Sequence, residues 1–219
     1  MTRAELRTEL ARRLEESTSS PVFFSEADMN GALNEGYMEM SDATEWYEVW
    51  RTVDLCHTRP YYDVRTVFND VEVLTPTRAF NEQTNRWLTP DTPVGLDRGF
   101  RRWEQSYGQP ERITIRGLFW FGYWPILAAE TGTVKQFATA LPESMEEDDD
   151  EPGFPEVYQH GLVEYALSTL LPQVGEVTRA LEAWGRYLGY ETGLQGYVDG
   201  RGSAPQVHGF GESANYSSR

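Results

Sequence analysis

The sequence predicts an α+β fold in which helices from both ends of the chain form a four-helix-bundle-like core, with a strand-rich region inserted between them. Apolar residues have helical spacing before residue 48 and after residue 155, and alternating spacing in between. A chain of 219 residues can bury most of its unfolded surface without a metal or a disulfide. We expect residues 1–48 with 152–190 to form the bundle, 49–151 the insertion, and 191–219 an extended tail that is flexible in isolation.

Capping signals place the first two helices. Thr2 and Glu5 have capping-box spacing at the start of a helix predicted over residues 4–16. Ser25 is the expected N-cap of a second helix over residues 26–47. One face of each predicted helix is apolar: Leu6, Leu10 and Leu14 in the first, and Met29, Leu33, Tyr37 and Met40 in the second.

Alternation of side chains marks the insertion as strand-rich. In residues 49–55, Val53 lies on the side opposite Asp54, as in a half-buried strand. Thr92 is the expected cap of a short helix over residues 93–105, which has a proline at its first position. Further strands are predicted over residues 61–68, 71–74, 112–116, 119–123 and 133–139.

Two more helices are predicted after the insertion. Pro155 suits the first position of a helix over residues 155–171, because a missing N–H costs nothing there. A last helix is predicted over residues 174–190. Its expected buried face is the stripe Val177, Leu181, Trp184 and Leu188.

The formal net charge of −16 restricts the classes of partner. Affinity for duplex DNA and for anionic membranes comes from clustered Lys and Arg, so the charge argues against both. The most apolar stretch, residues 117–129, is too short to span a bilayer and is interrupted by Pro125. The charged N-terminus predicts no signal peptide.

No set of residues predicts catalysis, a cofactor or a metal site. His57, His160 and His208 lack metal-ligand spacing and are expected on the surface. Cys56 precedes His57, but adjacent strand residues point to opposite faces and cannot form a nucleophile pair. An acidic run lacks the pattern of a calcium loop, and we expect it to be a solvated loop: Glu146, Glu147, Asp148, Asp149, Asp150 and Glu151.

Four segments occur in an order that resembles one protein family. They are ATEWYEVWRTVDL at 43–55, VEVLTPTRAF at 71–80, YGQPERITIRG at 107–117 and PGFPEVYQHGLVEYAL at 152–167. Together they resemble head-to-tail adaptor (connector) proteins of tailed bacteriophages, including the tail tubular protein A type. The resemblance covers residues 2–190.

The resemblance implies a structural virion protein of the neck, made in the host cytoplasm and without enzymatic activity. Such an adaptor forms a ring, expected to be dodecameric, below the portal. It extends the DNA channel and provides the platform for tail or nozzle proteins. The implied partners are therefore the portal protein, a tail or nozzle protein, other copies of the chain, and viral DNA that passes without sequence-specific binding.

The same analogy assigns roles to two segments. The tail would become ordered on the portal through sparse anchors: Tyr197, Val198, Val207, Phe210 and Tyr216. The acidic loop would face solvent or the lumen, where repulsion of phosphate lets DNA slide.

Two alternatives remain open at this stage. The aromatic residues between Phe119 and Trp124 could form the platform of a carbohydrate- or peptide-binding module, with Trp120, Tyr123 and Trp124 as contacts. The chain could also be a stopper or tail-completion protein, which would bind an adaptor instead of the portal.

Overall fold

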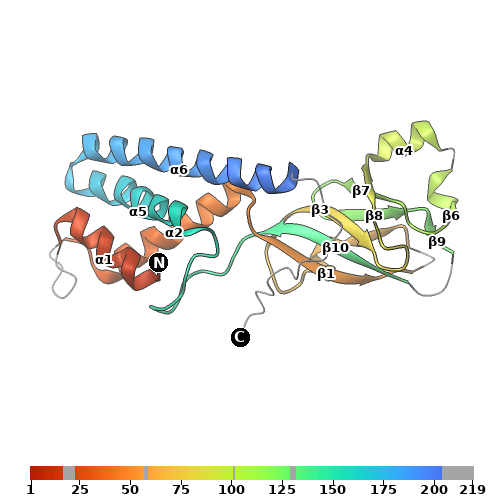
Figure 1. Ribbon diagram of the computed structural model, residues 1–219, viewed down its shortest axis with the longest axis horizontal. Coiled ribbons are helices and arrows are strands. Elements are labelled where there is room, and N and C mark those ends of the chain that lie inside the picture. The colour runs from red at the N-terminus through yellow and green to blue at the C-terminus, as the bar shows by residue number, and fades with distance from the viewer. Residues whose placement is uncertain (17–22, 57–58, 101, 129–131, 204–219) are drawn as a thin grey trace.

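A computed structural model describes residues 1–16, 23–56, 59–100, 102–128 and 132–203. A helical bundle forms one end of the elongated molecule and the strands form the other (Figure 1). The bundle helices are α1 (Arg3–Leu14), α2 (Glu26–Thr44), α5 (Glu156–Leu170) and α6 (Val177–Ser203). The shorter helices are α3 (Val64–Val67), α4 (Pro93–Gly99), η1 (Trp103–Gln105) and η2 (Leu171–Val174). The strands are β1 (Glu48–Asp54), β2 (Tyr61–Asp63), β3 (Val73–Asn81), β4 (Arg86–Trp87), β5 (Thr89–Asp91), β6 (Tyr107–Gly108), β7 (Arg112–Arg116), β8 (Trp120–Trp124), β9 (Ile126–Leu127) and β10 (Thr133–Ala140).

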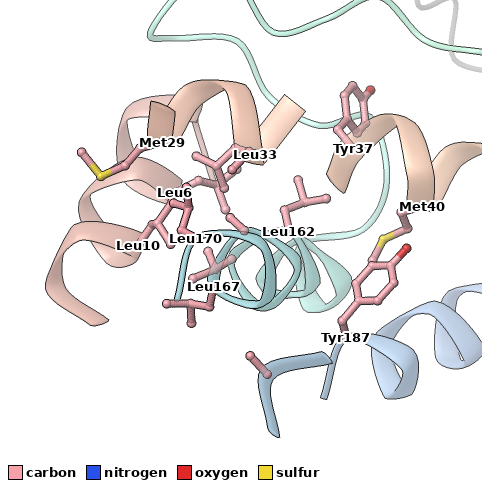
Figure 2. Close-up of a cluster of buried hydrophobic side chains, with 14 of the residues drawn as sticks. Leu6, Leu10, Met29, Leu33, Tyr37, Met40, Leu162, Leu167, Leu170 and Tyr187 are labelled. Carbon is pink, nitrogen blue, oxygen red and sulfur yellow. The ribbon is translucent and has the colours of Figure 1, made fainter. Parts of the chain in front are cut away.

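Helix α5 is the centre of the bundle and packs against α1, α2 and α6. A Cβ atom at Gly161 of α5 would lie 2.6 Å from Met40 Cε and 2.9 Å from Tyr190 Cβ, so only glycine allows this approach. Figure 2 shows the core side chains converging from all four helices, among them Leu6, Leu10, Met29, Leu33, Leu162, Leu167 and Tyr187.

A buried carboxylate also links three of the helices. Glu164 of α5 is only 4% exposed and accepts hydrogen bonds from two arginines. Arg13 Nη1 of α1 lies 2.7 Å from its Oε1, and Arg186 Nε of α6 lies 2.9 Å from its Oε2. A buried carboxylate needs such partners, because desolvation otherwise disfavours its charged form.

The strands form two four-stranded sheets that enclose a second core. Their orders are β1-β10-β3-β4 and β2-β8-β7-β5, and β6 pairs separately with β9. Val53 and Val134 from the first sheet pack in one cluster with Ile113 and Phe121 from the second. The hydroxyl of Tyr123 also donates a hydrogen bond across this core to Gln136 Oε1, at 3.0 Å.

An aromatic cluster joins the point where the chain leaves the bundle, after α2, to the point where it returns, before α5. Trp46 follows α2 and Phe154 precedes α5, and their ring centroids lie 5.5 Å apart in an edge-on arrangement. Tyr37 packs against both rings. Burial raises the pKa of Tyr37 to about 12, so its hydroxyl stays protonated while its oxygen accepts a hydrogen bond from the Gly153 N–H.

The acidic loop before α5 braces the start of α1. The backbone N–H groups of Arg3 and Ala4 donate to the carbonyl oxygens of Asp150 and Asp148, at 2.8 and 3.1 Å. The carboxylate of Asp148 accepts from Arg3 Nη2 at 2.9 Å and from both Nη atoms of Arg7 at 2.9 and 3.2 Å. These two arginines hold the pKa of Asp148 at about 2.

Most predicted elements are confirmed, including the capping box at Thr2, the N-cap at Ser25 and the strands over 49–55, 112–116 and 133–139 within a residue or two. The predicted strand over 61–68 is wrong beyond Asp63. The side chain of Asp63 accepts from the Arg65 N–H at 2.9 Å and starts one helical turn. The strand predicted at 71–74 begins only at Val73 and continues to Asn81, with a shift of register near Pro76. The helix predicted over 93–105 is divided into α4 and η1.

The last helix differs most from its prediction. It continues past residue 190 to Ser203, and the residues of the predicted buried stripe are 39–66% exposed. Of these residues, Trp184 also packs against Tyr165 of α5, with ring centroids 6.2 Å apart. The face that packs on α5 is instead formed by Ala180, Ala183, Tyr187 and Leu194. Small residues at 180 and 183 let the two helices approach closely, which the larger residues of the stripe would prevent.

Replacing Asp148 with Asn should lower the melting temperature at pH 7, because Arg3 and Arg7 lose their shared carboxylate. The folded pKa of about 2 is below the ordinary value of 3.8. The contribution is therefore complete above about pH 4 and disappears as the pH falls through 2. Thermal melts of wild type and D148N should thus converge below pH 2.

Asp149 provides the matched control, since it is exposed in the same loop. We expect D149N to melt within about 1 °C of wild type at pH 7. Equal effects of D148N and D149N would contradict a specific role of Asp148.

Replacing Glu164 with Gln should reduce the free energy of unfolding by about 1–3 kcal/mol, because two arginines lose a buried charged acceptor. The larger cost of breaking a fully buried pair does not apply, since the Arg186 side chain is 48% exposed. Urea denaturation followed by circular dichroism measures this change. E182Q, at an exposed position of α6, should leave the urea midpoint unchanged. A similar midpoint for E164Q would show that the ion pairs are dispensable.

Candidate assembly surfaces

The predicted acidic loop is largely engaged within the protein. Asp148 is bound to Arg3 and Arg7, and Asp150 Oδ2 accepts from the N–H groups of Glu146 and Glu147, both at 2.7 Å. The side chains of Glu146, Glu147, Asp149 and Glu151 remain exposed. The loop is therefore a structural brace of α1 that also presents acidic groups to its surroundings.

Residues 191–203, predicted to belong to an extended tail, are part of α6. Tyr197 and Val198 belong to α6, where Tyr197 packs against Tyr158 of α5 with ring centroids 6.1 Å apart. Val198 packs against the bundle core. The other expected anchors, Val207, Phe210 and Tyr216, lie outside the described residues. Two of the five expected anchors are therefore residues of α6 that pack within the subunit.

The aromatic residues between Phe119 and Trp124 do not form one surface. Phe119 and Trp120 are each 45% exposed near the turn between β7 and β8. Tyr123 points into the core between the sheets, and Trp124 is buried in a separate cluster with Leu96 of α4. Trp120, Tyr123 and Trp124 therefore cannot act together as a ligand platform.

A different aromatic group, which the sequence analysis missed, lies on the outward face of the β1-β10-β3-β4 sheet. Lys135 Nζ lies 4.8 Å from the ring centroid of Trp50. The Arg78 guanidinium lies 4.7 Å from the Trp87 ring and 5.1 Å from the Phe137 ring. Each cation also pairs with a carboxylate. The chain's own cations thus cover these rings. Such cation–ring contacts are typical of side chains that stabilise the surface of a sheet.

The exposed side of α6 carries large apolar residues that are predicted from the sequence to be buried. Val177 is 55% exposed and Leu181 66%, while Trp184 and Leu188 are near 40%. A shallow apolar groove is lined by Val177, Leu181 and Trp184 together with Ser168 and Pro172. Nine exposed residues make up what we call the outer α6 face: Val177, Thr178, Leu181, Trp184, Gly185, Leu188, Gly189, Thr192 and Gly196.

The residues examined for chemistry are dispersed. His160 is exposed on α5, as predicted, and Cys56 is half-buried after β1. His57 and His208 lie outside the described residues. Within the described ranges, no three His, Cys, Asp or Glu side chains are grouped so that they could hold a metal ion. None of the helices in those ranges is both long and apolar enough to cross a membrane.

Two of the segments that carry the resemblance meet in the structure. Trp46 from ATEWYEVW packs against Phe154 from PGFPEVYQ, and the YGQPERITIRG segment supplies β6 and β7. Comparison with curated proteins gave no match. Comparison with protein families matched residues 1–208 to the SU10 adaptor protein family. The match covers nearly the whole chain, so the protein belongs to the SU10 adaptor protein family and is a phage head-to-tail adaptor with a structural, non-enzymatic role in the virion.

Proposed function

We propose that twelve copies of this adaptor form a closed ring beneath the portal of its phage. The ring continues the DNA channel and gives tail or nozzle proteins their attachment platform. The family match over residues 1–208 is the observation that carries this proposal. The net charge of −16 supports it, because an acidic channel wall repels phosphate and lets DNA pass without being retained.

The shape of the subunit is suited to such a ring. A helical bundle and a two-sheet body lie at opposite ends of an elongated molecule (Figure 1). The aromatic cluster of Trp46, Phe154 and Tyr37 lies at the end of the bundle where the chain passes to the two-sheet body and returns. One end of each subunit can then contact the portal while the other is directed toward the tail.

Light scattering combined with negative-stain images tests the ring. Twelve copies of the 25.1 kDa chain give a particle of about 300 kDa. Closed rings near this mass, formed by the chain alone or after mixing with the portal of its phage, are the expected result. A chain that stays monomeric with the portal would contradict the proposal. Binding to an assembled adaptor ring and not to the portal would identify a stopper instead.

Removal of residues 204–219 tests the proposed portal-docking tail. Deletion from residue 195 would also remove the last turns of α6, including Val198, which packs on the core. The shorter deletion should leave the melting temperature within about 1 °C of wild type, because it leaves the described core complete. Portal binding should weaken by at least about tenfold, since the proposed anchors Phe210 and Tyr216 are lost.

Co-sedimentation with the portal measures this effect, and a full-length F210A/Y216A variant serves as its control. Loss of binding in both variants supports anchoring by these side chains. Unchanged binding after the deletion would show that the portal contact lies elsewhere.

A further inference from the structure

The outer α6 face has an unusual composition for a surface of this protein. At 100° per residue, its nine members occupy an arc of about 140° along the outside of the helix. The four charged residues of α6 between Val177 and Gly196 all lie outside this arc: Arg179, Glu182, Arg186 and Glu191. By contrast, α2 presents Glu35, Glu39 and Asp42 at its exposed positions.

The size of the face is also that of a contact surface. From Val177 to Gly196 it extends over about 28 Å of helix. Its four large apolar side chains are between 39% and 66% exposed, and three of them, Val177, Leu181 and Trp184, line the groove at Pro172. Contiguous apolar patches of roughly 300–600 Å² on a monomer are commonly functional.

Three glycines in this face have no packing reason within the subunit. A Cβ atom at Gly185, Gly189 or Gly196 would meet nothing within 4 Å, unlike one at Gly161. Glycine is the poorest helix former after proline, so such positions are unfavourable in an exposed helix. They leave a shallow strip beside Leu181, Trp184 and Leu188, along which another backbone can approach closely.

The charge of the chain favours a second copy as the occupant. Two copies that each carry a formal charge of −16 repel each other wherever acidic surfaces such as that of α2 would meet. An uncharged apolar face is the kind of surface on which such copies can associate without placing like charges together. A basic partner protein would be expected to bind an acidic surface of this chain, and the outer α6 face has no charged residue.

We infer that the outer α6 face is the surface through which one copy of the chain packs against the next. This inference rests on the proposed ring and names the surface that builds it. A closed ring repeats one heterologous contact, in which this face meets a different surface of the neighbouring copy. Blocking the face should therefore release monomers and leave no smaller stable assembly.

Introducing a charge tests the apolar part of the face. Leu181→Glu and Val177→Glu should each weaken association by at least about tenfold, because the contact would bury an unpaired carboxylate. Val94→Glu is the matched control. Val94 is 56% exposed at the start of α4, and Val177 is 55% exposed at the start of α6. Analytical ultracentrifugation of the full chain over a range of concentrations measures association.

Introducing a side chain tests the glycine strip independently. Gly189→Leu should raise the melting temperature of the monomer by about 2–4 °C, because a good helix former replaces glycine in open space. The same substitution should abolish the assembly by preventing close approach. A stabilised monomer distinguishes a blocked surface from a damaged fold.

The outcomes separate this inference from the proposed ring. Rings of wild type and V94E with monomers of L181E, V177E and G189L support both. Rings of all variants would overturn the α6 assignment and leave the ring intact. Wild-type dimers that these substitutions dissociate would keep α6 as the contact and contradict the ring. Wild type that is monomeric alone and on its portal would overturn both.

Discussion

The contact between Trp46 and Phe154 is the constraint on which the rest of the architecture depends. It joins the point where the chain leaves the bundle to the point where it returns, with the whole strand-rich part in between. A Cβ atom at Gly153 would lie 2.6 Å from Trp46 Cη2, so glycine is required where the returning chain passes the indole. Trp46 Nε1 is fixed by a hydrogen bond of 2.9 Å to Ser41 Oγ. Closing a loop of this length costs entropy, and this contact helps to offset that cost where α5 returns to pack on α1 and α2.

Electrostatic links then fasten the helices that this closure brings together. Asp148 joins the acidic loop to α1, and Glu164 joins α5 to α1 and α6. In a chain of net charge −16, Arg3, Arg7, Arg13 and Arg186 neutralise these two carboxylates. The remaining acidic groups of the loop and of α2 lie on the outside, where they limit the contacts that other copies can make.

Helix α6 performs two tasks with adjacent faces. Ala180, Ala183 and Tyr187 pack it on α5, and the residues of the outer α6 face beside them are exposed. Burying the small residues lets α5 and α6 approach closely and leaves the large ones outside. For a subunit that must fold before it assembles, this division keeps the contact surface separate from the residues that stabilise the monomer.

The sequence by itself determined the element types and the boundaries that local chemistry specifies. Capping at Thr2 and Ser25, the alternation in β1 and the order of the family segments were all evident from residues near one another in the chain. Tertiary structure decided which apolar face of α6 is buried, that Asp63 starts a helical turn, and that Trp124 and Tyr123 enter different cores. It also decided that Asp148 belongs to a brace, because Arg3 and Arg7 are distant in sequence. Periodicity ranks faces by hydrophobicity alone, whereas burial depends on how closely a neighbouring helix can approach, and that distance is fixed only when the whole bundle has formed.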